Sequence, residues 1–221
     1  YRFGTSRSSS ADALGTLAQQ AVPTSMQGAD GVPGRIATLI LAADHAWGST
    51  LAPVPVALPA AAPRAIFATG FSNGGDLSYY LAAQAEPFVT AVAPVGGTMM
   101  SSWGTGLRPA ARIPVLAVNM VDDTTTRWAG DPMNRDGWGA YLPVEEVRKA
   151  WVGGLGLERS EVKGLAGGIR RHRAWTGKDG CEVLLYEVPT GGHRWPANLG
   201  DAGKSTAGEI MEFFERLRGG G

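Results

Sequence analysis

The amino-acid sequence predicts an α/β protein in which a mostly parallel sheet is flanked by helices. Short apolar runs rich in β-branched residues alternate with segments of helical periodicity. Glycines and prolines, which favour turns, separate these segments. The length of 221 residues suits a single domain.

The composition argues against several classes of partner. Lys plus Arg and Asp plus Glu number 20 each, so the formal net charge is zero and nothing indicates a basic face for nucleic acid. No apolar run reaches the roughly 18 residues that a membrane-spanning helix needs. Cys181 is the only cysteine, which excludes an intramolecular disulfide and a cysteine-rich metal site.

The predicted elements follow from local patterns, taken in chain order. Residues 36–46 begin with a continuous apolar run, which fits either a buried strand or a buried helix. Residues 65–70 indicate a buried strand, and the helical spacing of Leu77, Tyr80 and Leu81 predicts a helix directly after it. Further strands are expected over residues 88–97, 113–120 and 181–188, and further helices over residues 143–151 and 205–217.

The last predicted helix has both a start signal and a core-facing stripe. Thr206 and Glu209 have the spacing of a capping box. The apolar positions that recur at helical spacing, and that we expect to be buried, are Ile210, Phe213, Phe214 and Leu217.

A serine flanked by glycines stands between the strand at residues 65–70 and the helix after it. Gly70, Ser72 and Gly74 form a Gly-x-Ser-x-Gly sequence, which in this context is typical of a nucleophile elbow. A side chain at either glycine would crowd the neighbouring strand and helix. The serine would then lie at a helix N-terminus, where the backbone N–H of Asn73 can stabilise an oxyanion. Glycine-rich turns also bind phosphate, but no lysine lies near this one.

A serine nucleophile needs a base, and the chain has three histidines. His193 follows the strand predicted at residues 181–188, in a loop position where ligand-facing residues gather in open α/β sheets. His172 lies among three arginines, which suits a surface role. His45 precedes Ser72, against the order serine, acid, histidine. We therefore predict His193 as the base.

The acid that orients the base should follow a strand between Ser72 and His193. Asp122 and Asp123 come directly after the apolar run that ends at residue 121, and a carboxylate there could accept the imidazole N–H and fix its tautomer. Consecutive side chains point in different directions, so one of the two can serve. In the polar loop that follows, two further carboxylates are fallback candidates, Asp131 and Asp136.

Together, these motifs resemble the poly(3-hydroxybutyrate) depolymerase and feruloyl esterase family of the α/β-hydrolases. The likeness covers residues 64–217 and rests on Gly-Phe-Ser-Asn-Gly-Gly at the elbow and Gly-Gly-His-Arg-Trp-Pro around the histidine. The resemblance implies Ser72 as nucleophile, Asp123 as acid and His193 as base, and it places Trp195 beside the active cleft.

The sequence departs from the family pattern in two places. Residues 119–121 read Asn-Met-Val where the family commonly has His-Gly-Thr before its acid. The chain also lacks the early His-Gly pair whose loop supplies a second oxyanion N–H. Either residues 36–46 are that strand, with Asp-His-Ala at 44–46 replacing the turn, or they are the helix before the elbow strand. Residues 1–63 are thus expected to be a divergent N-terminal part of one α/β-hydrolase-like domain spanning residues 1–221.

The resemblance implies a serine carboxylic-ester hydrolase that needs no metal and no organic cofactor. Its expected partners are hydroxyalkanoate polyesters or oligomers, or feruloyl and acetyl esters. Since the family is often exported, we expect a secreted or extracytoplasmic protein. The alternative is a non-catalytic ligand-binding protein on a degenerate scaffold, which the missing His-Gly pair favours. Aromatic residues that fit either the mouth of a cleft or ordinary core packing are Phe71, Trp103, Trp128, Trp138 and Trp195, of which Phe71 and Trp195 are predicted to bind substrate.

Overall fold

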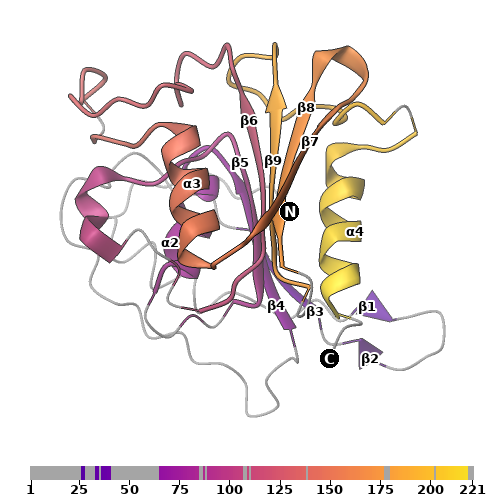
Figure 1. Ribbon diagram of the computed structural model, residues 1–221. Coiled ribbons are helices and arrows are strands. Elements are labelled where there is room, and N and C mark those ends of the chain that lie inside the picture. Colours follow the sequence, from indigo (N-terminus) through magenta and orange to yellow (C-terminus); the bar gives the residue numbers. More distant parts are fainter. Residues whose placement is uncertain are drawn as a thin grey trace, which may run out of the picture.

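The protein forms a seven-stranded mixed sheet with helices on both faces, as the computed structural model shows (Figure 1). The structure describes residues 26–27, 33–34, 36–40, 65–84, 87, 89–106, 109, 111–137, 139–176, 180–201 and 203–218. The strand order is β3-β4-β5-β6-β9-β8-β7. The first five strands in this order, β3, β4, β5, β6 and β9, pair in parallel. β8 pairs antiparallel with β9, and β7 pairs antiparallel with β8. This architecture agrees with the predicted α/β class and its mostly parallel sheet.

The described elements have the following bounds. The strands are β1 (Met26–Gln27), β2 (Pro33–Gly34), β3 (Ile36–Ile40), β4 (Ala65–Phe71), β5 (Ala91–Val95), β6 (Val115–Met120), β7 (Arg159–Gly164), β8 (Arg170–Trp175) and β9 (Glu182–Val188). The α-helices are α2 (Asn73–Ala82), α3 (Val144–Gly154) and α4 (Thr206–Arg218), and the short 3₁₀ turns are η1 (Ser101–Gly106) and η2 (Ala166–Gly168).

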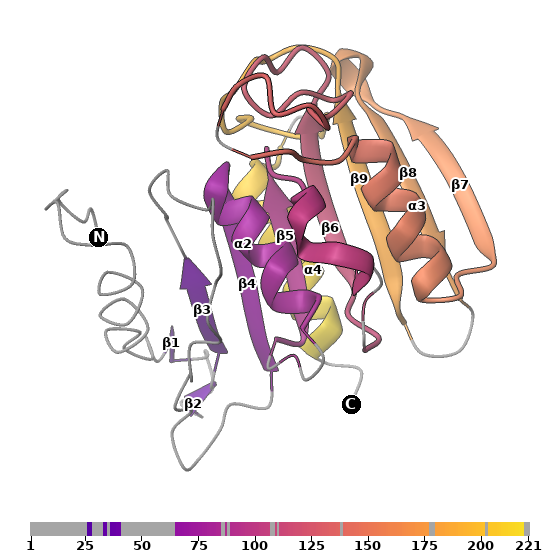
Figure 2. The ribbon, with the colours of Figure 1, turned by 90° about the vertical axis from the view of Figure 1, so that its left-hand side faces the viewer.

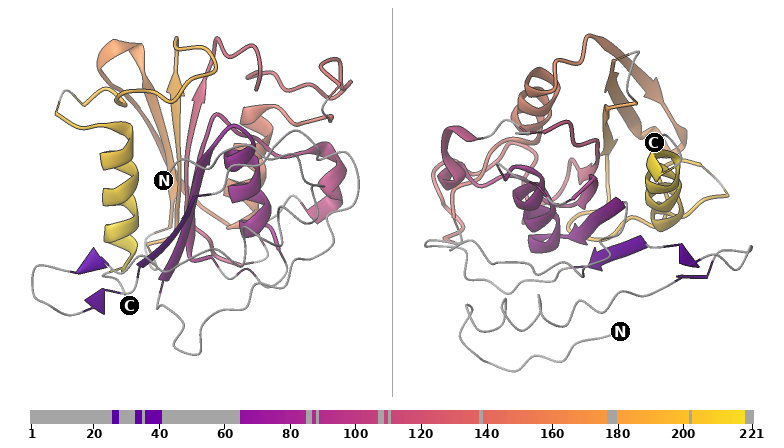
Figure 3. Two further views of the ribbon diagram at one scale, coloured as in Figure 1. Left: turned by 180° about the vertical axis from the view of Figure 1, so that it is seen from behind. Right: turned by 90° about the horizontal axis from the view of Figure 1, so that it is seen from below.

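Successive residues of each central strand point to opposite faces of the sheet, and both faces are buried. Helices α2 and α3 cover one face and α4 covers the other (Figures 2 and 3). Ile66 belongs to the core that contains Tyr79 of α2 and Trp151 of α3. Phe67, the next residue, lies in the opposite core and stacks on Phe214 of α4 at 4.6 Å between ring centroids. The apolar runs read from the sequence as buried strands therefore supply both layers.

The capping box predicted for the last helix is wrong. Ser205, one residue earlier than predicted, caps α4, and its Oγ accepts the backbone N–H of Gly208 at 3.0 Å. Among the described residues, the buried hydroxyl of Thr206 has no hydrogen-bond partner. Glu209 accepts the hydroxyl of Tyr186 at 2.6 Å and pairs with Lys204 at 2.7 Å. The predicted stripe is nevertheless confirmed, since Ile210, Phe213 and Phe214 are buried and Leu217 packs against them.

Residues 36–40 form a strand, so the helix alternative for this segment is wrong. β3 pairs in parallel with β4, and its last residue, Ile40, lies opposite Thr69. β3 thus ends at the sheet edge at which β4 leads into Ser72. The Asp-His-Ala turn proposed at 44–46 lies outside the described residues, and the division of the chain at residue 63 stays a prediction.

The antiparallel hairpin β7–β8, which was not predicted from the sequence, extends the sheet beyond β9. Every residue of β7 is exposed, and β8 carries a charged sequence, Arg-Arg-His-Arg. Neither strand therefore has the apolar alternation that marks a half-buried strand. Within the residues that the structure describes, no helix is long and apolar enough to cross a bilayer.

Candidate active site

Ser72 lies in the sharp turn between β4 and α2, at the carboxyl edge of the parallel strands. Its backbone has φ 56° and ψ −122°, a conformation that L-residues adopt only under constraint. The constraint comes from both sides of the turn. The N–H of Ser72 donates to the carbonyl of Val95 on β5 at 2.9 Å, and its own carbonyl accepts the N–H groups of Gly75 and Asp76 at 2.8 and 3.0 Å.

The glycines of this turn allow backbone to approach backbone, as predicted for Gly70. A Cβ at Gly70 would lie 2.6 Å from the carbonyl carbon of Gly74, far inside van der Waals contact. Gly75, the next residue of α2, makes a similar approach to Gly97, where a Cβ on Gly97 would also lie 2.6 Å from the backbone of Gly75. The N-terminus of α2 is therefore seated directly on β4 and on the segment that follows β5.

The structure brings the three predicted catalytic side chains into one hydrogen-bonded chain. Nε2 of His193 lies 2.8 Å from the Oγ of Ser72, and Nδ1 lies 2.7 Å from Oδ2 of Asp123. With the imidazole proton on Nδ1, the N–H donates to the carboxylate and Nε2 accepts the serine hydroxyl. This arrangement can deprotonate the serine as it attacks.

Asp123 is the carboxylate that contacts His193, and its other carboxylate oxygen accepts two backbone hydrogen bonds. Only 1% of its side chain is exposed. Oδ1 accepts the backbone N–H groups of Thr125 and Thr126 at 2.8 and 2.9 Å. These bonds hold the carboxylate rigidly, so that Oδ2 faces the imidazole.

The other predicted acids lie elsewhere. Asp122 is exposed and accepts the backbone N–H groups of Gly191 and Gly192. Asp131 accepts the backbone N–H of Asp136, and Asp136 pairs with Arg127 at 2.7 Å. The two fallback candidates therefore organise the loop after β6.

The remaining histidines do not join this chain of hydrogen bonds. His172 lies on β8, with its side chain 15% exposed and 2.8 Å from the carboxylate of Glu187. It is therefore half-buried in an ion-pair cluster, where a surface role was expected. His45 lies outside the described residues.

Two of the aromatic candidates lie beside His193. The ring of Phe71 lies 4.8 Å from the imidazole of His193, centroid to centroid, and 6.5 Å from the ring of Trp195. Trp195 is 40% exposed, so its ring is accessible to a ligand.

Two other aromatic candidates serve core packing. Trp103 packs edge-on against Tyr80 of α2, and both Trp103 and Trp128 contact the core beneath α2 and α3. Trp138 lies outside the described residues.

An open cleft of about 330 Å³ adjoins the loop that carries His193. Trp195 contributes to its wall and also contacts Phe71, the residue before Ser72. Its lining includes the polar residues Arg194 and Asn198 and the apolar residues Ile169 and Val188. The cleft can accept a small amphipathic group.

A buried carboxyl that was not predicted as a functional group lies in the first turn of α2. Asp76 is 5% exposed and accepts the backbone N–H of Thr98 at 2.7 Å. Burial raises the pKa of Asp76 to about 7. The sequence signal for this buried carboxyl was an aspartate four positions after the serine, beside the apolar stripe of Leu77 and Leu81.

Asn73, whose N–H was predicted to stabilise an oxyanion, is the first residue of α2. Its backbone N–H thus belongs to the positive end of the helix dipole, next to the Ser72 hydroxyl. Among the described residues, no group of three or more His, Cys, Asp or Glu side chains could hold a metal ion.

Comparison with family models and with curated protein sequences finds no match. Among solved structures, the crystal structure of esterase PE8 is similar at 17% identity and a TM-score of 0.38, and the match covers 67% of this chain. The matched region spans half the length of that esterase. A TM-score this low is insufficient to establish a shared fold.

Proposed function

We propose that the protein is a serine carboxylic-ester hydrolase of the α/β-hydrolase type. The observation that carries this proposal is the continuous chain from Ser72 Oγ through His193 to Asp123, with distances of 2.8 and 2.7 Å. The strained backbone of Ser72 is the second support, because strain of this kind concentrates at functional sites.

In the proposed first step, the Oγ of Ser72 attacks the ester carbonyl while Nε2 of His193 removes the hydroxyl proton. Asp123 keeps the imidazole proton on Nδ1 and stabilises the imidazolium that forms. The negative charge that develops on the carbonyl oxygen meets the backbone N–H of Asn73 at the N-terminus of α2. His193 then protonates the leaving alcohol, and an acyl-enzyme on Ser72 remains.

In the second step, His193 removes a proton from water, which attacks the acyl carbonyl. The tetrahedral intermediate collapses, the proton returns to Ser72 Oγ, and the carboxylic acid leaves. The reaction consumes one ester and one water and produces one acid and one alcohol.

The proposed substrates are hydroxyalkanoate polyesters or oligomers, or feruloyl and acetyl esters, as the resemblance implies. Phe71 and Trp195 would contact the substrate, and the cleft beside the His193 loop would hold the group next to the scissile bond. Since the family that the chain resembles is often exported, we also propose a secreted or extracytoplasmic location.

Turnover of short p-nitrophenyl esters by the wild type and by Ser72→Ala tests the proposal. We expect the substitution to lower kcat by roughly 10⁴-fold or more, because the nucleophile is lost. Equal rates for the two proteins would contradict an esterase that uses Ser72. A wild type that hydrolyses no ester would favour the ligand-binding alternative.

A further inference from the structure

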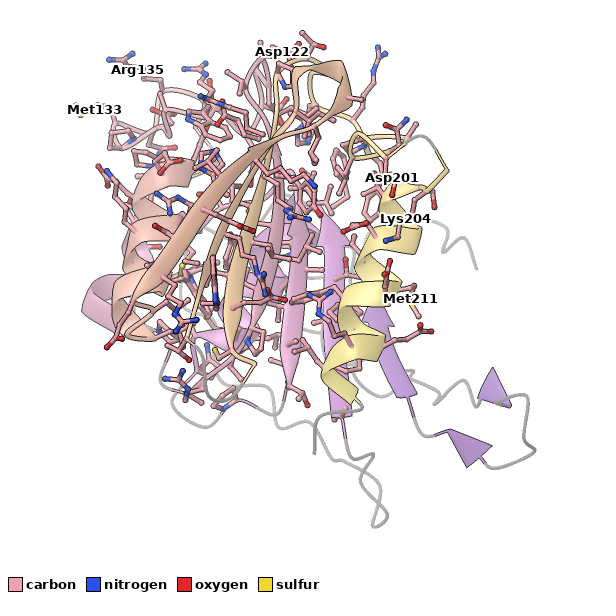
Figure 4. The ribbon with its side chains drawn as sticks, turned by 45° about the vertical axis from the view of Figure 1, so that its right-hand side comes forward. Asp122, Met133, Arg135, Asp201, Lys204 and Met211 are labelled. Carbon is pink, nitrogen blue, oxygen red and sulfur yellow. The ribbon has the colours of Figure 1, made fainter. Side chains whose placement is uncertain are left out.

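Two consecutive carboxylates at the end of β6 hold two consecutive parts of the His193 loop. Asp123 binds the imidazole of His193. Asp122 accepts the backbone N–H of Gly192 through Oδ1 at 2.8 Å and that of Gly191 through Oδ2 at 3.1 Å. Asp122 lies above the carboxyl ends of the strands, where Figure 4 labels it.

The loop segment that Asp122 binds has a backbone that favours glycine. Gly191 has φ 150° and Gly192 has φ 60°, both in the region that L side chains rarely adopt. Glycine is also the residue that loses most conformational entropy on ordering, so two glycines before His193 make its position costly to fix. The carboxylate of Asp122 offsets this cost by accepting both N–H groups.

The contact continues the pairing of β6 with β9. The ladder ends where the N–H of Val121 donates to the carbonyl of Val188 at 2.8 Å. The residue after Val121 is Asp122, whose side chain binds the segment that follows β9, at Gly191 and Gly192, three and four residues after Val188. The Asp122 side chain thus continues to hold the β9 segment next to the β6 segment beyond the last backbone hydrogen bond, up to the residue before His193.

Asp122 is well suited to this contact at neutral pH. The N–H groups of Gly192 and Gly191 hold the pKa of Asp122 below its usual value, so the carboxylate is charged and accepts with both oxygens.

We propose that Asp122 is a positioning residue that fixes the backbone of Gly191 and Gly192 and thereby holds His193 Nε2 within reach of Ser72. This inference rests on the proposed esterase function. The order of the two acids then has a reason, since Asp123 orients the ring of the base and Asp122 orients the chain that carries it.

The test compares Asp122→Asn with Asp201→Asn. Asp201 is also exposed and its side chain accepts one glycine N–H, that of Gly203, but it lies in the loop before α4, as Figure 4 shows. Asn at position 122 can accept one N–H through Oδ1 but turns its NH₂ group toward the other N–H, so one of the two hydrogen bonds is lost. We expect kcat for a p-nitrophenyl ester to fall about 10- to 100-fold in Asp122→Asn with little change in KM.

Thermal unfolding separates positioning from a loss of fold. Asp201→Asn should keep the wild-type kcat, and both variants should unfold near the wild-type temperature. A wild-type kcat in Asp122→Asn would overturn the inference.

A readout without turnover keeps the inference separate from the esterase proposal. In imidazole ¹⁵N–¹H spectra, the Nδ1–H resonance of His193, identified by its loss in His193→Gln, should be strongly shifted downfield by Asp123. We expect this resonance to broaden or disappear in Asp122→Asn and to persist in Asp201→Asn. If it persists in Asp122→Asn, the inference is wrong; if the wild type hydrolyses no ester, only the proposed function is.

Discussion

Ser72 Oγ and His193 Nε2 lie 2.8 Å apart although 121 positions separate them in the chain. The sheet accounts for this distance. β4, β6 and β9 are parallel, so Ser72, Asp123 and His193 all follow the carboxyl ends of strands at one edge. The geometry of the site is therefore set by strand order, and each member of the chain can be changed separately.

Asp123→Asn should reduce kcat by about 10⁴-fold, as loss of the orienting acid does in a serine protease. The amide oxygen can still accept the N–H groups of Thr125 and Thr126, which leaves the amide NH₂ facing Nδ1 of His193. The imidazole would then carry its proton on Nε2, where it cannot accept from Ser72. Ester turnover across pH 6–9 measures this loss, and a variant that retains a tenth of wild-type activity would contradict the assignment.

Ser72→Gly should be more stable than Ser72→Ala by about 1 kcal/mol. Alanine retains a Cβ at φ 56°, where strain costs about 1–3 kcal/mol, and glycine relieves it at a smaller cost in unfolded-state entropy. Both variants should be inactive. Urea denaturation of the pair measures the difference, and an alanine variant as stable as the glycine variant would show that the turn is unstrained.

Gly70→Ala should destabilise the fold by about 1–3 kcal/mol or more, because the new methyl group would lie 2.6 Å from the backbone of Gly74. Gly153→Ala is the matched control. Gly153 is exposed in α3 with no atom within 4 Å of a new Cβ, so alanine should stabilise the helix by about 0.5–1 kcal/mol. Thermal unfolding should move in opposite directions, and a Gly70→Ala protein of wild-type stability would contradict the close approach.

Asp76→Asn should change how stability depends on pH. The carboxyl of Asp76 has a pKa of about 7 in the folded protein and an ordinary value of 3.8 when unfolded. Its protonation thus contributes stability that is fully present below pH 3.8 and is lost as the pH rises to about 7. At 1.36 kcal/mol per pKa unit, the loss is on the order of 4 kcal/mol.

The amide of Asp76→Asn can still accept the N–H of Thr98 and carries no charge. We therefore expect the variant to be more stable than the wild type at pH 8 and close to it at pH 4. Chemical denaturation at the two pH values measures this. A difference between the two proteins that is the same at both pH values would show that Asp76 does not titrate in this range.

The elbow and its partners were predictable because each carries a local signal. Gly70 and Gly74 flank a serine between an apolar run and a helical pattern, and the close approach at Gly70 now accounts for its glycine. The choice between Asp122 and Asp123 was open, because adjacent residues have equal claims in sequence. Hydrogen bonds decide it, since Asp123 meets the imidazole and Asp122 meets the backbone of Gly192.

Other features depend on contacts that the sequence does not express. β7 and β8 form a hairpin whose charged side chains find partners across strands, as His172 does with Glu187. Strands that pair through charged side chains do not show the alternation of apolar and polar residues by which a strand is predicted from sequence. Ser205, and not Thr206, caps α4, and the buried stripe does not distinguish the two, because it is the same for either cap.

Labelling with a fluorophosphonate, followed by mass spectrometry of the digested protein, tests the central claim most directly. Only a serine activated by a neighbouring base reacts quickly. We expect one modification per chain, on the peptide that contains Ser72, and its loss in His193→Gln. An unlabelled wild type, or a label on another serine, would contradict it.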